Sequence, residues 1–150
     1  MKKSAGILVY RKKGKEIEYL LVHPGGPFYR NKDLNSWSIP KGEYDDTEDA
    51  FEAAKREFFE ETGIRIEGDF IGLKPVRQNG GKAVITWAVE ADIDTSKIKS
   101  NTFELEWPPK SGKYQKFPEI DRAEWFNYEE AKKKVLKGQI PVIDELSGML

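Results

Sequence analysis

The segment from Gly42 to Ile64 reads GEYDDTEDAFEAAKREFFEETGI. After residue 47 its apolar residues recur at three- and four-residue steps, which is typical of a helix with one face directed at the core. Any of residues 45–47 (Asp-Asp-Thr) can cap this helix, and we expect it to run to Thr62. Gly63 is expected to end it, because glycine adopts the left-handed C-terminal conformation without strain. The apolar stripe consists of Ala50, Phe51, Ala54, Phe58 and, beyond the helix, Ile64.

Three glutamates of the same helix lie off the apolar stripe. Glu60 and Glu61 follow Glu57 by three and four residues, so their side chains are expected to converge on one patch. A solvated acidic surface is the ordinary interpretation of such a patch, and a structural module without phosphate chemistry remains one alternative. Carboxylates this close repel one another, however, and a divalent cation relieves the repulsion. Oxygen ligands at this density suit Mg2+ or Mn2+, which keep several waters and bridge to phosphates.

The glycine and charged positions together resemble a known signature. In order they read G, five residues, E, seven residues, REU, one residue, EE, one residue, GU, in which U is bulky and apolar. This is the pattern of a complete Nudix box, and the chain is therefore similar to Nudix hydrolases. The matching residues are Gly42, Glu48, Arg56, Glu57, Phe58, Glu60, Glu61, Gly63 and Ile64.

The resemblance implies metal-dependent cleavage of a phosphoanhydride, a reaction that needs charge stabilisation, an activated water and in-line geometry. It implies that Glu57, Glu60 and Glu61 coordinate Mg2+ or Mn2+, with more than one ion present when substrate is bound. A backbone carbonyl near Lys41 or Gly42 is expected to contribute, and we include Gly42 among the metal ligands. Glu57 is our first choice for the general base. Family members differ in which carboxylate deprotonates the water, so this role stays open to the others.

Further charged residues complete the expected site. Arg56 is included with the catalytic residues, and its expected role is to orient a carboxylate by ion pairing. Glu48 is expected to act structurally at the helix start. The family commonly supplies another carboxylate from a later loop. Glu119, six residues before the Trp-Phe pair of the expected last strand, is predicted to reach the metal or the water. Glu104 and Glu106 are the alternatives.

Five basic or aromatic residues outside the helix are expected to bind substrate. The segment WSIPKG at 37–42 resembles the entry to the box in nucleotide and dinucleoside polyphosphate hydrolases, and its lysine places a positive charge beside the diphosphate. The loop at 23–35 and the connection at 93–116 each combine aromatic and basic side chains, which can stack a base and hold a phosphate. Solvated residues are the alternative reading of the lysine and the first loop, and His23 is expected to be a loop residue without assigned chemistry. The five are Lys41, Tyr29, Arg30, Lys113 and Lys116.

Periodicity and turn residues predict the remaining elements. Two strands at 3–11 and 16–22 are expected to form a hairpin, and a short strand at 37–39 is expected to end at Pro40. The resemblance implies the Nudix fold of the α/β class: an α/β/α sandwich with a mixed, curved sheet, in one domain over residues 1–150. The other expected elements are a hairpin of 66–76 and 82–92 around Asn79-Gly80-Gly81, strands at 103–107 and 123–126, a helix from Asn127 to about Lys137, and a terminal helix beginning at Pro141.

Composition excludes several classes of site. The chain of 150 residues has no cysteine and a single histidine, which excludes thiolate chemistry and cages of several histidines. Its net charge of -1 gives no general attraction to nucleic acid or to an anionic membrane. The apolar run near the N-terminus is too short for a signal peptide or a membrane span. We therefore expect a cytoplasmic monomer or homodimer with a small-molecule nucleotide as its partner.

Several substrates fit the resemblance. NTPs and dinucleoside polyphosphates such as Ap4A are favoured, because the 37–42 segment and the HPGGPF segment lean toward hydrolases of these compounds. NDP-sugars, dinucleotide coenzymes and substrates resembling the mRNA cap remain alternatives, since specificity depends on loops outside the box. A non-catalytic, nucleotide-sensing protein of the same fold is the alternative of another class, and the intact set of glutamates argues against it.

Overall fold

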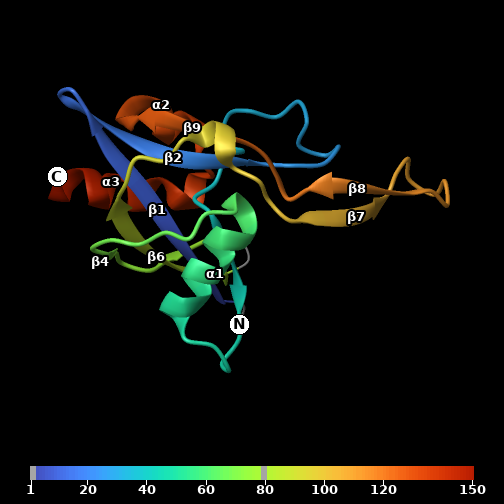
Figure 1. Ribbon diagram of the computed structural model, residues 1–150, viewed down its shortest axis with the longest axis horizontal. Helices are drawn as coiled ribbons and strands as arrows, with labels where there is room; N and C mark the ends of the chain where they lie inside the picture. Colours follow the sequence, from blue (N-terminus) through green and yellow to red (C-terminus); the bar gives the residue numbers. More distant parts are fainter. Residues whose placement is uncertain (1–2, 79–80) are drawn as a thin grey trace.

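The computed structural model describes residues 3–78 and 81–150. Helices cover a central sheet, and a two-stranded arm projects from one end (Figure 1). No helix in the described ranges is long and apolar enough to cross a membrane. The strands are β1 (Lys3–Lys13), β2 (Glu16–Pro24), β3 (Lys41–Tyr44), β4 (Ile71–Gly72), β5 (Val76–Arg77), β6 (Ala83–Glu90), β7 (Thr102–Glu106), β8 (Tyr114–Pro118) and β9 (Ile120–Asn127). The helices are α1 (Ala50–Thr62), α2 (Tyr128–Lys134) and α3 (Ile140–Met149), with 3-10 turns η2 (Thr95–Lys97) and η3 (Lys137–Gln139).

The central sheet is mixed, as predicted. Its strand order is β4-β6-β1-β2-β9, with β3 also paired with β1 and β5 with β6. The β1–β6 pair is parallel, whereas β2 and β3 are antiparallel to β1. Along one side of β1, residues 3–6 pair with β3 and residues 10–13 pair with β2. The predicted β1–β2 hairpin is confirmed, with Gly14 in its turn at a φ of 63°.

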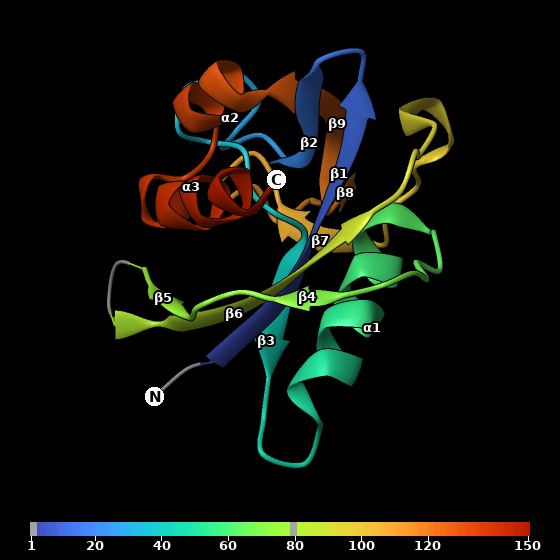
Figure 2. The same cartoon turned by 90° about the vertical axis from the view of Figure 1, so that its left-hand side faces the viewer.

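Both faces of β1 are buried, which explains its nearly continuous apolar sequence. Side chains alternate across a strand, so Ala5, Ile7 and Val9 belong to the core beneath α1. Leu8 and Tyr10 belong to the second core, beneath α2 and α3. Figure 2 shows α1 on one side of the sheet and α2 with α3 on the other. The predicted α/β/α sandwich is therefore confirmed.

Helix α1 is where the sequence predicts it, with a different cap. Its N-cap is Asp49, which accepts a hydrogen bond from the Glu52 amide at 3.1 Å. The prediction of a cap within residues 45–47 is wrong, because Asp45 instead accepts from the Thr47 amide at 2.9 Å and closes a turn. Gly63 ends the helix in the left-handed conformation at a φ of 74°, as predicted.

Two predictions on the N-terminal side are wrong. Of the expected strand at 37–39, only Trp37 and Ser38 form isolated bridges. The strand follows Pro40 instead of ending there, because β3 begins at Lys41. A proline lacks only its own amide hydrogen, so pairing can resume at the next residue. His23 belongs to β2 and not to a loop. Its ring is fully buried, with Nδ1 2.8 Å from Asp121 Oδ1 and Nε2 2.7 Å from the Lys32 carbonyl.

The second strand of the predicted central hairpin is confirmed. Residues 83–90 form β6, but the first predicted strand pairs with it only as the short strands β4 and β5. Pro75 stands between them and cannot donate to the ladder, and Gly68 has a φ of 148°. Of the expected Asn79-Gly80-Gly81 turn, residues 79–80 lie outside the described ranges.

The C-terminal elements follow the prediction with shifted ends. Asn127 caps α2 by accepting from the Glu130 amide at 2.9 Å. The helix ends at Lys134 and not near residue 137, because Val135 forms a parallel bridge with Trp37 and the Leu136 amide donates to the Trp37 carbonyl at 2.8 Å. Helix α3 begins one residue before Pro141.

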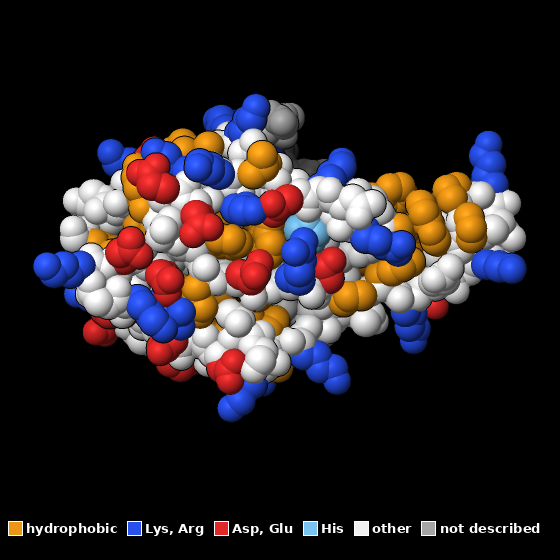
Figure 3. All heavy atoms as spheres, turned by 90° about the horizontal axis from the view of Figure 1, so that it is seen from above, with side chains coloured by type: hydrophobic (Ala, Val, Ile, Leu, Met, Phe, Trp, Pro, Cys, Tyr) orange, Lys and Arg blue, Asp and Glu red, His pale blue; other side chains and the backbone are white. Residues whose placement is uncertain are grey.

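The connection after β6 contains a feature that the sequence only partly indicates. β7 agrees with the expected strand at 103–107, but β8 was not predicted, and the two form a separate antiparallel arm. Figure 3 shows hydrophobic side chains gathered along this projection, on the right. Phe28 from the 23–35 loop packs edge-on against Trp107 of the arm, with ring centroids 5.5 Å apart. The 23–35 loop and the β7–β8 arm are therefore in contact with each other.

Candidate functional site

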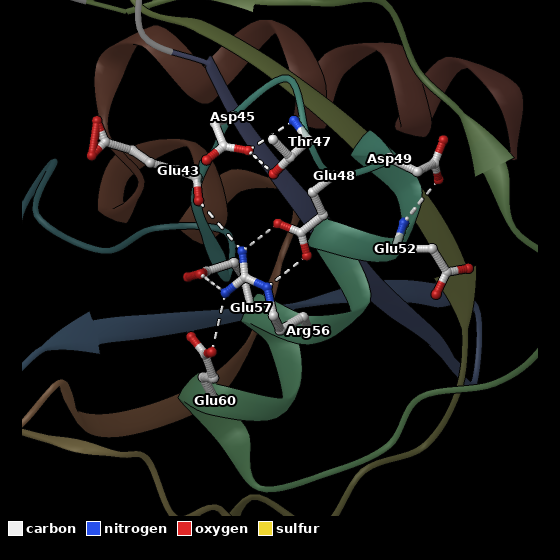
Figure 4. A network of polar contacts seen from close by, with 9 residues as sticks. All are labelled: Glu43, Asp45, Thr47, Glu48, Asp49, Glu52, Arg56, Glu57 and Glu60. Carbon is white, nitrogen blue, oxygen red and sulfur yellow. Dashed lines mark hydrogen bonds and ion pairs between the residues drawn. The ribbon is translucent and has the colours of Figure 1, made fainter.

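Arg56 joins three glutamates at the outer edge of α1 (Figure 4). Its guanidinium donates to both carboxylate oxygens of Glu48, at 2.7 and 2.9 Å. One terminal nitrogen also donates to Glu57 at 2.9 Å and to Glu60 at 3.1 Å. A further contact reaches the Glu43 carbonyl at 3.5 Å. Such charge-assisted contacts fix both partners, so the geometry fits an orienting role for Arg56 and a structural role for Glu48.

Glu57 lies under β3, at a point where glycine leaves room for its carboxylate. The Glu57 side chain is 13% exposed. A Cβ atom built on Gly42 would stand 1.7 Å from Glu57 Oε1, so a larger residue there must displace the carboxylate. Burial and then the charge of Glu60 raise the pKa of Glu57, and the ion pair with Arg56 acts in the opposite direction. Gly42 thus lies directly against the carboxylate of Glu57.

Glu61 is the most perturbed carboxylate of this group. Burial, and then the charge of Glu57, raise its pKa to about 8. Lys41 opposes this shift, both by its charge and by a backbone hydrogen bond to Glu61. Burial, and then the charge of Lys82, lower the pKa of Lys41 itself. The partly buried Lys41 therefore lies within electrostatic range of Glu57 and Glu61.

A pair of backbone hydrogen bonds brings Glu119 to the end of α1. The Asn101 amide donates to the Glu60 carbonyl at 2.8 Å, and the Glu119 amide donates to the Asn101 carbonyl at 2.8 Å. Burial and then the charge of Glu60 raise the pKa of Glu119. The alternatives lie on the arm: Glu106 accepts hydrogen bonds from amides of the arm's own turn, and Glu104 lies opposite Lys116. The arrangement favours Glu119 as the outer carboxylate.

The match to known proteins agrees with this geometry. A family model described as NUDIX domain matches residues 1–146. The chain belongs to the Nudix family. The box glutamates, the arginine that orients them and the later carboxylate are thus assembled on a Nudix domain.

Curated relatives extend the comparison. The chain is 40% identical over 65 residues to the asymmetrical bis(5'-nucleosyl)-tetraphosphatase of Caenorhabditis elegans, a match covering 43% of each chain. It is 32% identical over 114 residues to Nudix hydrolase 7 of Arabidopsis thaliana, covering 70% of this chain and 38% of that protein. An RNA pyrophosphohydrolase of Bartonella henselae is 35% identical over 68 residues, covering 43% of this chain and 36% of that protein. The matches therefore span less than half the length of these relatives.

Solved structures share the fold. The binary complex of the C. elegans Ap4A hydrolase matches with a TM-score of 0.67 and 23% identity, covering 97% of this chain and 96% of that one. The NUDIX domain of Shewanella oneidensis NrtR, complexed with ADP ribose, matches with a TM-score of 0.65 and 13% identity, covering 98% and 86%. At these identities the likeness shows the fold alone.

The Nudix carboxylates fit a divalent cation through their chemistry. Within residues 3–78 and 81–150, no three acidic or histidine side chains form a ready-made metal cage. Mg2+ is commonly held by one or two carboxylates, with waters and substrate phosphates as its other ligands. Glu57, Glu61 and Glu119 all have raised pKa values, which burial and neighbouring carboxylates cause. A bound cation would offset both effects.

The structure separates the residues predicted to bind substrate. Lys41 lies beside the carboxylates, whereas Tyr29 and Arg30 lie in the loop and Lys113 and Lys116 lie at the arm. Lys113 is at the tip of the arm, where its carbonyl accepts from the Trp107 amide at 2.9 Å. The Tyr29 side chain is 41% exposed. The four outer residues keep their substrate roles as predictions.

A hollow beside Lys41 brings in residues that the sequence did not indicate. They come from the 23–35 loop, the β5–β6 connection and η3, so no spacing links them. Lys82 and Lys137 stood at the ends of predicted elements, the strand at 82–92 and the helix to about residue 137, but neither prediction placed them beside Lys41. The residues that join Lys41 there are Asn35, Gln78, Lys82, Leu136, Lys137 and Gly138.

Replacing Arg56 with lysine is expected to lower kcat by about 10- to 100-fold with little loss of stability. A single ammonium group cannot hold Glu48 with two hydrogen bonds and also reach Glu57 and Glu60. Steady-state kinetics at saturating Mg2+ and thermal unfolding are the measurements. Lys55→Gln is the control, because Lys55 lies on the same helix and pairs with Glu52. An Arg56→Lys variant with the kcat of Lys55→Gln would contradict the orienting role.

Proposed function

We propose that this protein is a pyrophosphohydrolase that uses Mg2+ or Mn2+ to cleave a phosphoanhydride bond in a nucleoside diphosphate linked to X. The observation that carries the proposal is a group of partly buried carboxylates, of which two are within electrostatic range of Lys41. The group consists of Glu57, Glu60, Glu61 and Glu119. Like charges collected in this way are costly unless a cation and a phosphate-bearing substrate complete the site.

Each residue of the site has a separate proposed role in hydrolysis. Glu57, Glu60 and Glu61 would hold a divalent cation, which would supply charge neutralisation at the phosphate oxygens and a lower pKa for the attacking water. Glu57 accepts the proton of that water as its oxygen attacks phosphorus, and the bridging P–O bond breaks to release the second phosphate product. Arg56 holds the carboxylates of Glu57 and Glu60 in place, and Lys41 stabilises charge on the diphosphate. Glu119 is held near Glu60 by the Asn101 backbone and is proposed as the outer carboxylate.

NTPs and dinucleoside polyphosphates such as Ap4A are the proposed substrates. Support comes from the relative named bis(5'-nucleosyl)-tetraphosphatase, whose name refers to a tetraphosphate. The relative named RNA pyrophosphohydrolase supports pyrophosphate hydrolysis more generally. NDP-sugars and dinucleotide coenzymes are the second candidates. A purely sensing role is disfavoured, because the box glutamates are all present.

The test is a substrate panel with product analysis. Purified protein with Mg2+ or Mn2+ is offered NTPs, dinucleoside polyphosphates, NDP-sugars, dinucleotide coenzymes and triphosphorylated RNA, and products are separated by ion-exchange chromatography. We expect the highest kcat/KM for an NTP or a dinucleoside polyphosphate. A highest value for an NDP-sugar would move the assignment to the second candidates. If no compound released a phosphate-containing product, the proposed enzymatic function would be refuted.

A further inference from the structure

His23 is a fully buried polar side chain that takes no part in the hydrolysis described above. Its Nε2 lies 2.7 Å from the Lys32 carbonyl oxygen, which can only accept a hydrogen bond, so Nε2 donates to it. Its Nδ1 lies 2.8 Å from Asp121 Oδ1, and a hydrogen atom must lie between these two atoms as well. The ring also packs edge-on with Trp37, with centroids 5.1 Å apart. The imidazole therefore joins the 23–35 loop to the start of β9.

Asp121 is the extra residue of a β-bulge. Up to His23, β2 pairs with β9 in one unbroken register, in which His23 stands opposite Arg122. The next pair is Pro24 with Ile120, so the register skips Asp121. Bulges bend a strand and redirect the residues beyond them, and they are common beside active sites. The side chain that contacts His23 is thus the one that the register shift leaves over.

The register shift determines which residue meets Gly25. If the register before the bulge continued, Ile120 would stand opposite Gly25. With the bulge, Glu119 is there instead, and its carbonyl accepts from the Gly25 amide at 2.9 Å. A Cβ on Gly25 would stand 1.9 Å from the Pro118 carbonyl oxygen, so this close approach requires glycine. From this position the Glu119 backbone is joined to α1 through the Asn101 backbone.

We propose that His23 and Asp121 are positioning residues: their contact holds the bulge, and the bulge brings Glu119 to the carboxylates of α1. This inference rests on the proposed function, because the position of Glu119 affects turnover only if Glu119 is the outer carboxylate of a hydrolase. Both residues act through Glu119 and not on the substrate. The competing explanation is that the contact only stabilises the fold, in which case its loss would cost the same whether or not Glu119 is present.

Amide hydrogen exchange of the metal-free protein tests the positioning without catalysis. The Asp121 side chain is 32% exposed, so its variants are expected to fold. In Asp121→Ala, the amides of Gly25 and Glu119 are expected to exchange about tenfold faster than in wild type, because the bend that they hold loses its anchor. Asp121→Asn is expected to stay within about threefold of wild type, since its side-chain amide can donate to Nδ1 of a neutral ring.

Glu124→Gln is the control for the exchange experiment, because Glu124 is an exposed carboxylate on the same strand. Its exchange rates are expected to stay within about twofold of wild type. Exchange of the Gly25 and Glu119 amides at the wild-type rate in Asp121→Ala would overturn the proposal.

A double-mutant cycle on the best substrate of the panel separates positioning from general stability. Asp121→Ala is expected to lower kcat about tenfold with KM within about twofold, whereas Asp121→Asn is expected to keep kcat within about threefold of wild type. In a Glu119→Gln background the alanine substitution is expected to cost less than about twofold, because the carboxylate that it positions is already gone. An equal loss in both backgrounds, or full activity of Glu119→Gln, would overturn the proposal.

The two experiments also separate failure of this inference from failure of the proposed function. If wild-type protein turned over no compound of the panel, the hydrolase would fail, and amide exchange would still decide whether the contact between His23 and Asp121 holds the bend at Glu119. Normal turnover by wild type with equal losses in both backgrounds would leave the hydrolase intact and overturn only the positioning role.

Discussion

Replacing Glu57 with glutamine is expected to lower kcat by about 10^3-fold or more at saturating Mg2+. The amide keeps the shape of the side chain against Gly42 but removes the charge that would hold the cation and accept the proton. Because the neutral group also relieves repulsion from Glu60, the variant should be at least as stable as wild type without metal. Single-turnover kinetics and thermal unfolding are the measurements.

The matched control for Glu57→Gln is Glu52→Gln. Glu52 belongs to the same helix, its side chain is 64% exposed, and it pairs with Lys55. We expect its kcat to stay within about twofold of wild type, because exposed ion pairs contribute little. If Glu57→Gln kept the kcat and metal dependence of Glu52→Gln, the carboxylate site would be misassigned.

Replacing Glu61 with glutamine is expected to stabilise the metal-free protein in alkaline solution and to remove most of the stabilisation that Mg2+ or Mn2+ gives. The pKa of Glu61 is raised to about 8 in the folded protein, mainly by burial. A carboxyl with a raised pKa makes the folded state less stable as pH increases from its unfolded pKa to its folded pKa. At about pH 8.5 we therefore expect Glu61→Gln to increase the free energy of unfolding by about 3 kcal/mol. Calorimetric melting provides the measurement.

The pH dependence supplies the internal control for Glu61→Gln. Near pH 4 the wild-type carboxyl is protonated in both states, so the two proteins are expected to unfold at similar temperatures. In alkaline solution a divalent cation should raise the melting temperature of wild type by several degrees and that of the variant by much less. Equal metal stabilisation in the two proteins would exclude Glu61 as a ligand. A variant less stable than wild type at high pH would contradict the buried-charge explanation.

The residues of the helix could be predicted because their signals are local. Apolar spacing from residue 50 onward defines α1, and glycine at 63 marks its end, as the structure confirms. The spacing of Glu57, Glu60 and Glu61 likewise places them on one helix. The N-cap of α1 could not be predicted from the local sequence. It depends on which aspartate, Asp45 or Asp49, accepts a hydrogen bond from the unpaired amides of the first helical turn.

Features built from distant segments were beyond prediction from spacing. Glu119 itself was predicted as the outer carboxylate, but the Asn101 backbone bridge that joins it to Glu60 has no signal in the local sequence. The hollow beside Lys41 likewise requires η3 to lie beside β5, with Gly138 close to Gln78. Lys41 and Gly42 face opposite sides of β3. This could not be predicted, because it follows from the register of β3 against β1, and the sequence had indicated that a strand ends at Pro40.

Turnover of the best panel substrate as a function of free Mg2+ tests the central claim most directly. We predict saturable, metal-dependent release of a phosphate-containing product by wild type, with no turnover in excess chelator and about 10^3-fold lower turnover in Glu57→Gln at every Mg2+ concentration. Turnover that persists in chelator, or that Glu57→Gln retains in full, would contradict a metal-dependent hydrolase built on these carboxylates.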